Sequence, residues 1–260
     1  MLNKVAMIAP KQYMQEIGRE NDFHLFLAHM VQNDATYAKL AKEARGYKIL
    51  DNSFFELGYS LPVDKLISLA DEINASCIVL PDGLEGFDQK HKVLERTSYD
   101  IMLVPKVFEH LTGFARFALD TPRVYVGLSG IHTANILNDK FGLNVKKFEC
   151  MNRFLVLSQL MSEDTQLYKK FITSKKLHLL GLGDYPLLEL KTFNLAGIEY
   201  TNDSNAYVWP FLSDKLGFGV IEKKFTQPLD FNFTSDVDGW RFYKVVLEEI
   251  LCGLMGVDND

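Results

Sequence analysis

The sequence predicts an α/β fold, a single (β/α)8 barrel, and three observations support this prediction. Short apolar runs bounded by turn residues recur along the chain, as expected of buried strands. Segments with apolar residues at helical spacing separate these runs, and strands that alternate with helices form parallel sheets. The chain has 260 residues, close to the roughly 250 residues that such a barrel commonly uses.

Eight segments are expected to form the strands. Each is an unbroken apolar run, as required of a strand that is covered on both faces. They are residues 5–10, 24–31, 47–51, 76–82, 101–106, 124–130, 177–183 and 197–203. Eight parallel strands in this length favour a closed TIM-type barrel over an open sheet, and neither a GxGxxG loop nor a Walker loop follows any of them.

The segments between the strands are compatible with amphipathic helices. They are residues 33–45, 62–75, 85–98, 108–119, 144–172 and 184–195. The connection after the sixth strand, residues 131–176, is long enough for two or three helices, so we expect a helical insertion there. Residues 236–256 are expected to form the closing helix. Because no linker, repeat or low-complexity segment divides the chain, residues 1–260 are predicted to form one domain.

Composition limits the classes of function. The chain is 47% hydrophobic, but no apolar run approaches the ~20 residues that span a bilayer, so no membrane association is expected. Cys77, Cys150 and Cys252 lie too far apart to suggest a disulfide framework or a CxxC-type zinc site, which favours a reducing, cytoplasmic setting. We therefore expect a soluble cytoplasmic protein.

The charge pattern bears on nucleic-acid binding. A net charge of −6 argues against indiscriminate binding, because phosphate contacts need lysine and arginine. Local basic clusters remain candidates for phosphate contacts, although such clusters are more often only solvated faces. The nucleic-acid-binding candidates are Lys146, Lys147, Lys175 and Lys176.

Three aspartates stand where predicted strands end, and in barrels the reactive groups come from these ends. Asp51 ends the third strand, Asp82 the fourth and Asp203 the eighth. Each alone could simply be a helix N-cap or begin an Asx-turn. Together they would open onto one mouth, where two carboxylates can perform a double displacement: one attacks to form a covalent glycosyl intermediate and the other handles the proton.

Glycines and aromatic residues mark the same predicted ends. Gly127, Gly130, Gly181 and Gly183 would let the backbone approach a flat ligand, or would serve only as ordinary turns. Phe54, Phe55, Tyr207 and Trp209 could stack on a base, or belong only to the core. His178 precedes two of these glycines, and a hydrogen-bonded histidine inside the barrel is its simpler interpretation.

Five short motifs occur in an order that is typical of one enzyme family. They are LDNSFF at 50–55, PDGLEG at 81–86, VGLSG at 126–130, HLLGLGDYPLLEL at 178–190 and NDSNAYVWP at 202–210. In these motifs and their order, the chain resembles the tRNA-guanine transglycosylase superfamily. In its compactness it is similar to the phage and bacterial branch that inserts 7-deazaguanine bases into DNA.

The resemblance implies separate roles for the aspartates. Asp203 would be the nucleophile and Asp51 the proton-handling residue, while Asp82 would read the edge of the base. It also implies a set of residues that bind the base through side chains or backbone. They are Asp82, Asn52, Ser53, Phe55, Gly127, Leu128, Ser129, Gly130, Gly181, Gly183 and Tyr207.

Departures from the family pattern shape the expected substrate. The zinc site of tRNA-acting members needs three clustered cysteines and a histidine, which this chain lacks, so DNA is favoured over tRNA. Lys106 and Val107 replace an expected Gln-Gly pair, and Asp184 and Tyr185 stand where threonine would precede the proline. No metal and no cofactor is expected. The expected partners are DNA and a 7-deazaguanine base such as preQ0, and a homodimer is left open.

Two other functions use the same residues. A barrel nucleosidase or DNA base hydrolase would use the same carboxylates with water as the acceptor. A catalytically inert relative would bind nucleic acid without base release. Base exchange in DNA is the leading hypothesis, because it is the activity that the resemblance implies; a tRNA-acting transglycosylase also stays open.

Overall fold

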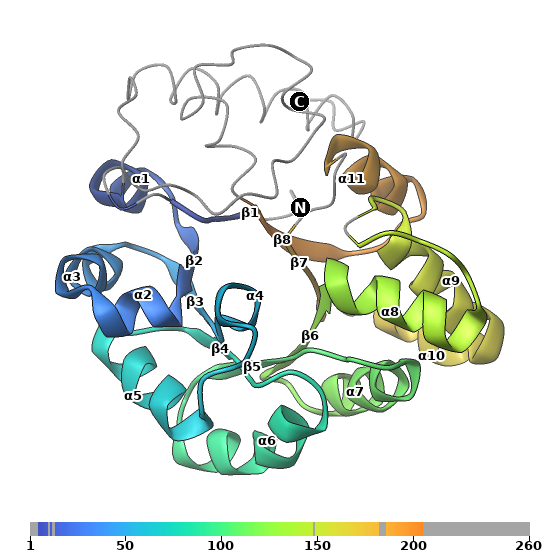
Figure 1. The fold of residues 1–260 in the computed structure, drawn as a ribbon, viewed down its shortest axis with the longest axis horizontal. Helices are drawn as coiled ribbons and strands as arrows, with labels where there is room; N and C mark the ends of the chain where they lie inside the picture. Colours follow the sequence, from blue (N-terminus) through green and yellow to red (C-terminus); the bar gives the residue numbers. More distant parts are fainter. Residues whose placement is uncertain (1–4, 10, 12–13, 148, 182–185, 205–260) are drawn as a thin grey trace.

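The computed structural model describes residues 5–9, 11, 14–147, 149–181 and 186–204, and these form the predicted barrel (Figure 1). Eight parallel strands pair in sequence order, and β1 pairs with β8 to close the sheet. The strands are β1 (Val5–Met7), β2 (Phe23–Leu27), β3 (Tyr47–Asp51), β4 (Cys77–Val79), β5 (Asp100–Leu103), β6 (Val124–Ser129), β7 (Leu177–Leu180) and β8 (Tyr200–Ser204). The predicted (β/α)8 fold class is confirmed.

Helices surround the strands as a ring, except for the short helix α4, which lies inside it (Figure 1). They are α1 (Met14–Glu20), α2 (Ala28–Asn33), α3 (Ala35–Glu43), α4 (Phe54–Leu57), α5 (Val63–Ile73), α6 (Leu84–Arg96), α7 (Phe108–Asp120), α8 (Gly130–Phe141), α9 (Asn152–Glu163), α10 (Thr165–Ile172) and α11 (Pro186–Leu195). The predicted insertion after the sixth strand is confirmed as α8, α9 and α10. The predicted closing helix at 236–256 lies outside the described residues.

The second predicted strand, 24–31, was too long. The strand ends at Leu27, and helix α2 begins at Ala28. Within this helix Ala28 and Val31, three residues apart, are the buried positions. That spacing turns one helical face to the core, whereas the continuous apolar run alone could not distinguish a strand from the first turn of a helix.

Helix α5 shows how the sequence sets its own boundaries. Pro62 precedes the first residue, where the lack of an N–H costs nothing. The buried residues of the helix recur at helical spacing, as expected of the predicted amphipathic helix 62–75: Val63, Leu66, Leu69, Ala70 and Ile73. Asn74 ends the helix in a left-handed conformation with φ of 53°, and its N–H reaches back to the carbonyls of the last turn.

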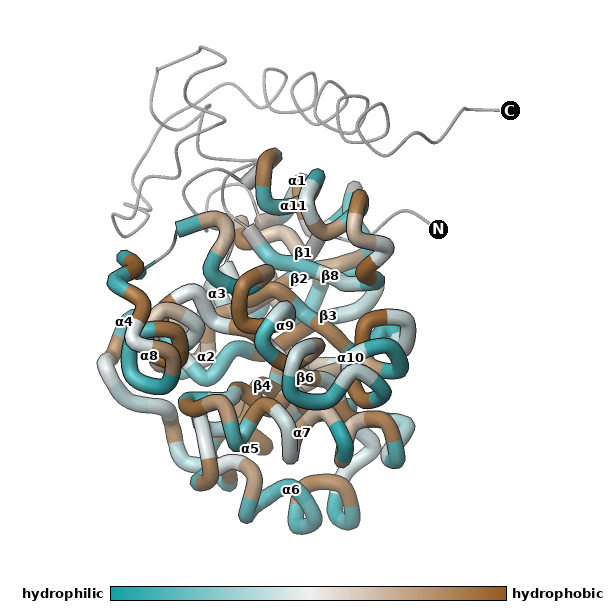
Figure 2. The backbone as a smooth tube through the Cα atoms, turned by 90° about the vertical axis from the view of Figure 1, so that its right-hand side faces the viewer, coloured by the Kyte–Doolittle hydropathy of each residue, from teal (hydrophilic) through white to brown (hydrophobic). Residues whose placement is uncertain are grey.

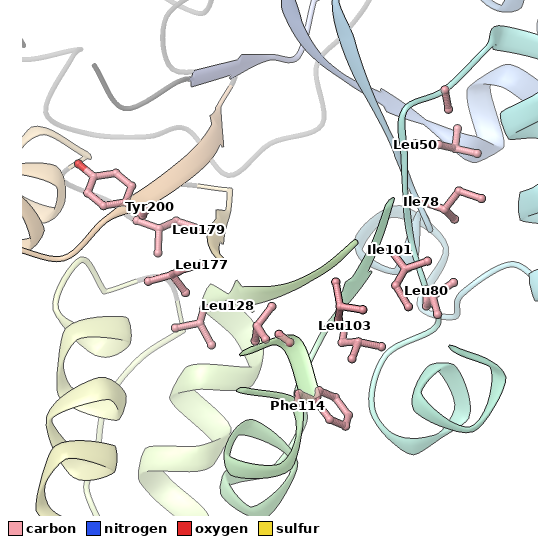
Figure 3. Packing of buried hydrophobic residues seen from close by; sticks show 14 of the residues in the cluster. Leu50, Ile78, Leu80, Ile101, Leu103, Phe114, Leu128, Leu177, Leu179 and Tyr200 are labelled. Atoms are coloured by element: carbon pink, nitrogen blue, oxygen red, sulfur yellow. The ribbon is translucent and has the colours of Figure 1, made fainter. Parts of the chain in front are cut away.

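The barrel has two apolar layers. Outward-facing residues such as Leu50, Ile78 and Leu128 pack between the strands and the helices (Figure 3). Inward-facing residues such as Ile49 and Met102 fill the barrel. Figure 2 shows hydrophobic segments along the strands and hydrophilic stretches on outer helices such as α6 and α10. The inner layer stops at the C-terminal ends of the strands, where polar residues begin.

Two helical glycines give matched predictions of stability. A Cβ at Gly86 in α6 would lie 2.1 Å from the Pro81 carbonyl oxygen, so Gly86→Ala must push the helix away from the end of β4. We expect a loss of about 1–3 kcal/mol in the free energy of unfolding. A Cβ at Gly113 in α7 meets no atom within 4 Å, so Gly113→Ala is expected to stabilise by about 0.5–1 kcal/mol. Urea denaturation measures both changes, and equal shifts would contradict the described approach of α6.

Candidate active site

Asp51 and Asp203 face the same space at the mouth of the barrel. Successive residues of a strand alternate between its faces, so Asp51 shares the inward face of β3 with Ile49, which belongs to the inner layer. The negative charge of Asp203 contributes to the raised pKa of Asp51, which places the two carboxyl groups within electrostatic range of each other. The structure thus brings together the two residues predicted to be catalytic.

The Asp203 carboxylate is buried and is held by three hydrogen bonds. The Gly181 amide lies 3.1 Å from Oδ1 and 3.0 Å from Oδ2, so it donates to both oxygens. His178 Nε2 lies 3.0 Å from Oδ1. Donors on two sides fix the direction in which the carboxylate points, because their geometry restricts rotation of the group.

His178 is therefore part of the site, and its two ring nitrogens have different roles. A carboxylate can only accept, so the Nε2 atom facing Asp203 carries a proton. Nδ1 lies 2.7 Å from the Thr201 hydroxyl oxygen, which donates to it when the ring is neutral. Because both nitrogens are engaged and the ring is buried, His178 orients Asp203 rather than contacting a substrate.

Asp51 holds its proton far more tightly than an ordinary aspartate. Burial raises the pKa of Asp51 well above its usual value, and the negative charges of Glu56, Asp203 and Asp82 raise it further. The Ser53 amide donates to Asp51 Oδ2 at 2.7 Å and opposes this effect in part. A carboxyl group with a raised pKa can act as a general acid near neutral pH.

Glu56 is a further carboxyl group at the mouth, which the sequence did not single out. It lies on the short helix α4, which follows β3 directly and appears inside the ring of helices in Figure 1. Burial of its carboxyl group raises the pKa of Glu56, and the charge of Asp203 raises it further, although the residue as a whole is exposed. Its main effect on the site is to make ionisation of Asp51 harder.

The turn after β3 is built from two overlapping Asx-turns. Oδ2 of Asp51 accepts from the Ser53 amide, and the Asn52 side-chain oxygen accepts from the Phe54 amide at 2.9 Å. Ser53 is fully buried and takes a left-handed conformation with φ of 61°. Its hydroxyl oxygen accepts from the His29 amide and lies 3.0 Å from His29 Nδ1, so the ends of β2 and β3 are joined beside Asp51.

Asp82 lies in a buried network beside this turn. Asn52 Nδ2 donates to Asp82 Oδ1 at 2.8 Å and to the Leu80 carbonyl at 2.8 Å. His132 Nε2, from the first turn of α8, lies 2.6 Å from Asp82 Oδ2. Both oxygens of Asp82 thus have a protein partner, so a bound base would have to share this carboxylate with Asn52 and His132.

Residues of the β6 and β7 motifs serve the scaffold as well as the mouth. A Cβ at Gly127 would lie 2.6 Å from Leu180 Cδ1, so this glycine makes room for inward-facing side chains. The Leu128 side chain is buried in the outer layer (Figure 3). Ser129 caps α8 by accepting from the Ile131 amide, and Gly130 is the first residue of that helix. Of the predicted base-binding glycines, the structure brings Gly181 into direct contact with Asp203, which was predicted to be catalytic.

Aromatic residues lie on α4, directly after β3. Phe55 is 53% exposed, while Phe54 lies with its ring centroid 5.4 Å from that of His132. Lys106, one of the departures from the family pattern, holds its ammonium nitrogen 5.0 Å from the centre of the Phe54 ring. Gly183, Tyr207 and Trp209, with Asp184 and Tyr185, lie outside the described residues.

The four candidate lysines fall into two groups. Lys146 and Lys147 are exposed in the loop before α9. The Lys146 carbonyl accepts from Asn152, and the next residue, Arg153, reaches the C-terminal ends of β6 and β7. Lys175 and Lys176 precede β7 and so lie at the opposite end of the barrel. Lys176 donates to the Thr121 carbonyl at 3.2 Å. The structure therefore brings only the first pair to the side of the mouth.

Arg153 is a site residue that sequence reasoning missed. It is a buried arginine of α9, and its guanidinium contacts backbone carbonyls at the ends of β6 and β7 together with the buried Glu189. A basic residue within a long insertion gives no signal of its own in a single sequence. Only the three-dimensional path of the insertion brings this arginine to the strand ends.

The described residues include neither a metal-binding cluster nor a membrane-spanning helix. In the part of the chain that the structure describes, no group of three or more histidine, cysteine, aspartate or glutamate side chains is arranged to hold a metal ion. Among the described helices, none combines the length and the apolar character needed to cross a membrane.

Comparisons with known proteins add a likeness of fold. No protein-family model matches the chain, and no curated protein matches it in sequence. Thiamine phosphate pyrophosphorylase from Pyrococcus furiosus is similar at 12% identity and a TM-score of 0.48, over 95% of this chain and 96% of that one. A variant of the citrate synthase SbnG is similar at 15% identity and a TM-score of 0.48, over 81% of this chain and 90% of that one. The protein CitE from Mycobacterium tuberculosis is similar at 9% identity and a TM-score of 0.39, over 90% and 97%. Likenesses this low say nothing about the reaction.

Proposed function

We propose that the chain is a base-exchange glycosyltransferase that replaces guanine in DNA with a 7-deazaguanine base such as preQ0. The single observation that carries the proposal is the pairing of unlike carboxyl groups at one barrel mouth. Asp203 is held by the Gly181 amide and His178, whereas burial raises the pKa of Asp51. Double displacement requires one carboxylate that attacks and one carboxylic acid that moves a proton.

The proposed reaction has two halves. In the first, an Asp203 oxygen attacks C1′ of the nucleotide, the C1′–N9 bond breaks, and the proton of Asp51 goes to the leaving guanine. In the second, the incoming base gives a proton to Asp51 and attacks C1′, which breaks the ester to Asp203 and restores both groups. No electron is gained or lost, so the cycle needs no redox partner.

The choice of DNA rests on the sequence resemblance and is compatible with the mouth. The target base must leave the helix stack, which costs a few kcal/mol, and be held against aromatic or apolar side chains. The exposed Phe55 and Tyr59 lie on the loop that follows β3, and Lys146 and Lys147 can contact phosphates from the same side. Lys175 and Lys176 are not part of this proposed surface, because they lie at the other end of the barrel.

The proposal is tested with the full chain, duplex DNA and isotopically labelled preQ0. Incorporation of label into DNA supports it, whereas incorporation into tRNA alone would move the substrate to tRNA. Release of free guanine with abasic sites and without label would instead show a hydrolase that uses the same carboxylates. DNA binding with neither label nor base release would show an inert relative.

A further inference from the structure

Arg153 has an unusual place for a charged residue. It lies on α9, within the insertion after β6, and its side chain is 1% exposed. Nε donates to the Leu128 carbonyl at 2.7 Å, and Nη1 donates to Glu189 Oε1 at 2.6 Å. Nη2 donates to the Leu180 carbonyl at 2.6 Å and also to that of Gly181. The guanidinium is thus surrounded by acceptors.

Three of these acceptors are main-chain carbonyls at the C-terminal ends of two neighbouring strands. Burying an ion pair costs several kcal/mol in desolvation, and apolar residues of similar volume often stabilise a fold equally well. Stability alone therefore does not require a guanidinium here. Its planar fork does provide what apolar residues cannot: several donors in fixed directions that hold separate carbonyls relative to one another.

Gly181 links this arginine to the nucleophile. Its carbonyl accepts from Arg153, while its amide donates to both oxygens of Asp203. Gly181 has φ of 57°, in the left-handed region, and glycine has more backbone freedom than any other residue. The Gly181 amide belongs to the same planar peptide unit as the Leu180 carbonyl, which also accepts from Arg153. Anchoring the carbonyls on both sides of Gly181 restrains the rotation that would otherwise turn the amide away from Asp203.

We infer that Arg153 is a positioning residue that, through Gly181, sets the direction from which Asp203 attacks. The inference rests on the proposed function, in which Asp203 is the nucleophile. It also gives the helical insertion a role in the chemistry, since α9 supplies the guanidinium. A misplacement of about 1 Å in reacting groups can cost on the order of 10²-fold in rate, so a modest rotation at Gly181 is enough to matter.

The test compares three variants of the full chain. Arg153→Met combined with Glu189→Leu removes the clamp together with its partner in the buried ion pair. Glu189→Gln keeps the arginine and its three carbonyl contacts. Arg123→Met is the matched control, because Arg123 likewise donates to three main-chain carbonyls, at 2.6–3.1 Å, but precedes β6 at the far end of the barrel.

Two measurements separate positioning from folding. Labelling leucine carbonyls and glycine amides restricts the NMR spectrum to Leu–Gly pairs, among them Leu180–Gly181, so the shift of the Gly181 amide proton reports its bond to Asp203. The single-turnover rate of covalent adduct formation on DNA reports attack. Both are recorded well below the unfolding temperature of each variant, together with DNA affinity.

The double variant is expected to shift the Gly181 amide proton upfield and to form adduct about 10- to 100-fold more slowly at unchanged DNA affinity. Arg123→Met and Glu189→Gln should leave the amide shift and the rate at wild-type values. An unchanged amide or an unchanged rate in the folded double variant overturns the inference. If the wild type forms no adduct on any nucleic acid, the proposed function fails, and the amide shift still decides whether Arg153 holds Gly181 against Asp203.

Discussion

Asp203→Asn is expected to abolish the covalent adduct between the protein and DNA and to lower base exchange on the order of 10⁴-fold or more, as removal of a nucleophile does in other enzymes. An amide oxygen is a poor nucleophile, and the substitution keeps the size of the side chain. The Gly181 amide can still donate to the oxygen of asparagine. Denaturing gel electrophoresis of the protein with labelled DNA measures the adduct.

The matched control for this variant is Asp139→Asn, an exposed aspartate of α8. It makes the same chemical change away from the mouth and should retain wild-type activity. DNA affinity of the Asp203 variant should stay within a few-fold of wild type, since the proposed phosphate contacts of Lys146 and Lys147 do not involve Asp203. An undiminished adduct in Asp203→Asn would show that another residue attacks C1′.

Asp51→Asn is expected to lower activity about 10²- to 10⁴-fold, the usual contribution of a general acid or base. Asparagine can accept from the Ser53 amide as aspartate does, but it has no proton to give. The rate of each half-reaction measures this loss. Adduct formation should slow because the leaving guanine is no longer protonated, and exchange by the incoming base should slow because its proton has no acceptor.

The same variant is expected to be more stable than the wild type at pH 7. Burial raises the pKa of Asp51 above that of the unfolded chain, so the folded protein binds this proton more tightly. Stability then falls as the pH rises from the ordinary pKa of an aspartate through the raised one. Asparagine removes this cost, so the gain in unfolding temperature should be present at pH 7 and vanish near pH 3. A gain that is independent of pH would argue against a raised pKa.

The pH dependence of the reaction gives a second check on Asp51. Adduct formation needs the protonated acid, so its rate should fall as the pH rises through the raised pKa of Asp51. Glu56→Gln removes the largest of the neighbouring charges that raise this pKa, and the alkaline limb should therefore move to lower pH. Lys65→Gln also changes one charge, but on the outer surface of α5 and away from Asp51. It should leave the alkaline limb of the pH–rate profile in place.

The sequence predicted the barrel because its signal is repeated and local. Each strand is a short apolar run, and the third segment, 47–51, matches β3 residue for residue. The end of the second segment was mispredicted because Ala28 and Val31 are buried on one face of helix α2 and not in a strand. A run of apolar residues that passes from a strand into a helix shows neither the strand period nor the helix period. Boundaries of this kind depend on the tertiary packing of both elements.

The site was predictable only in part. Asp51 and Asp203 stand at strand ends, so topology alone brings them to one mouth. The partners that orient them are distant in sequence: His29 reaches Ser53 across 24 positions, and Arg153 reaches Gly181 across 28. The sequence pointed to His178 only as a hydrogen-bonded histidine inside the barrel. Its 3.0 Å contact with Asp203, which the sequence does not reveal, is what makes it a residue that orients Asp203. Such pairs form between residues that are distant in the chain, and a single sequence does not show which of these residues meet in the folded protein.

The raised pKa values of Asp51 and Glu56 have a consequence for ligand affinity. A bound polyanion adds negative potential at the mouth and makes ionisation of both groups harder still. The complex should then take up protons from solution, and by linkage DNA should bind more tightly as the pH falls. Because the buffer supplies these protons, the measured heat of DNA binding should change with the ionisation enthalpy of the buffer. Protons would thus bind together with the DNA.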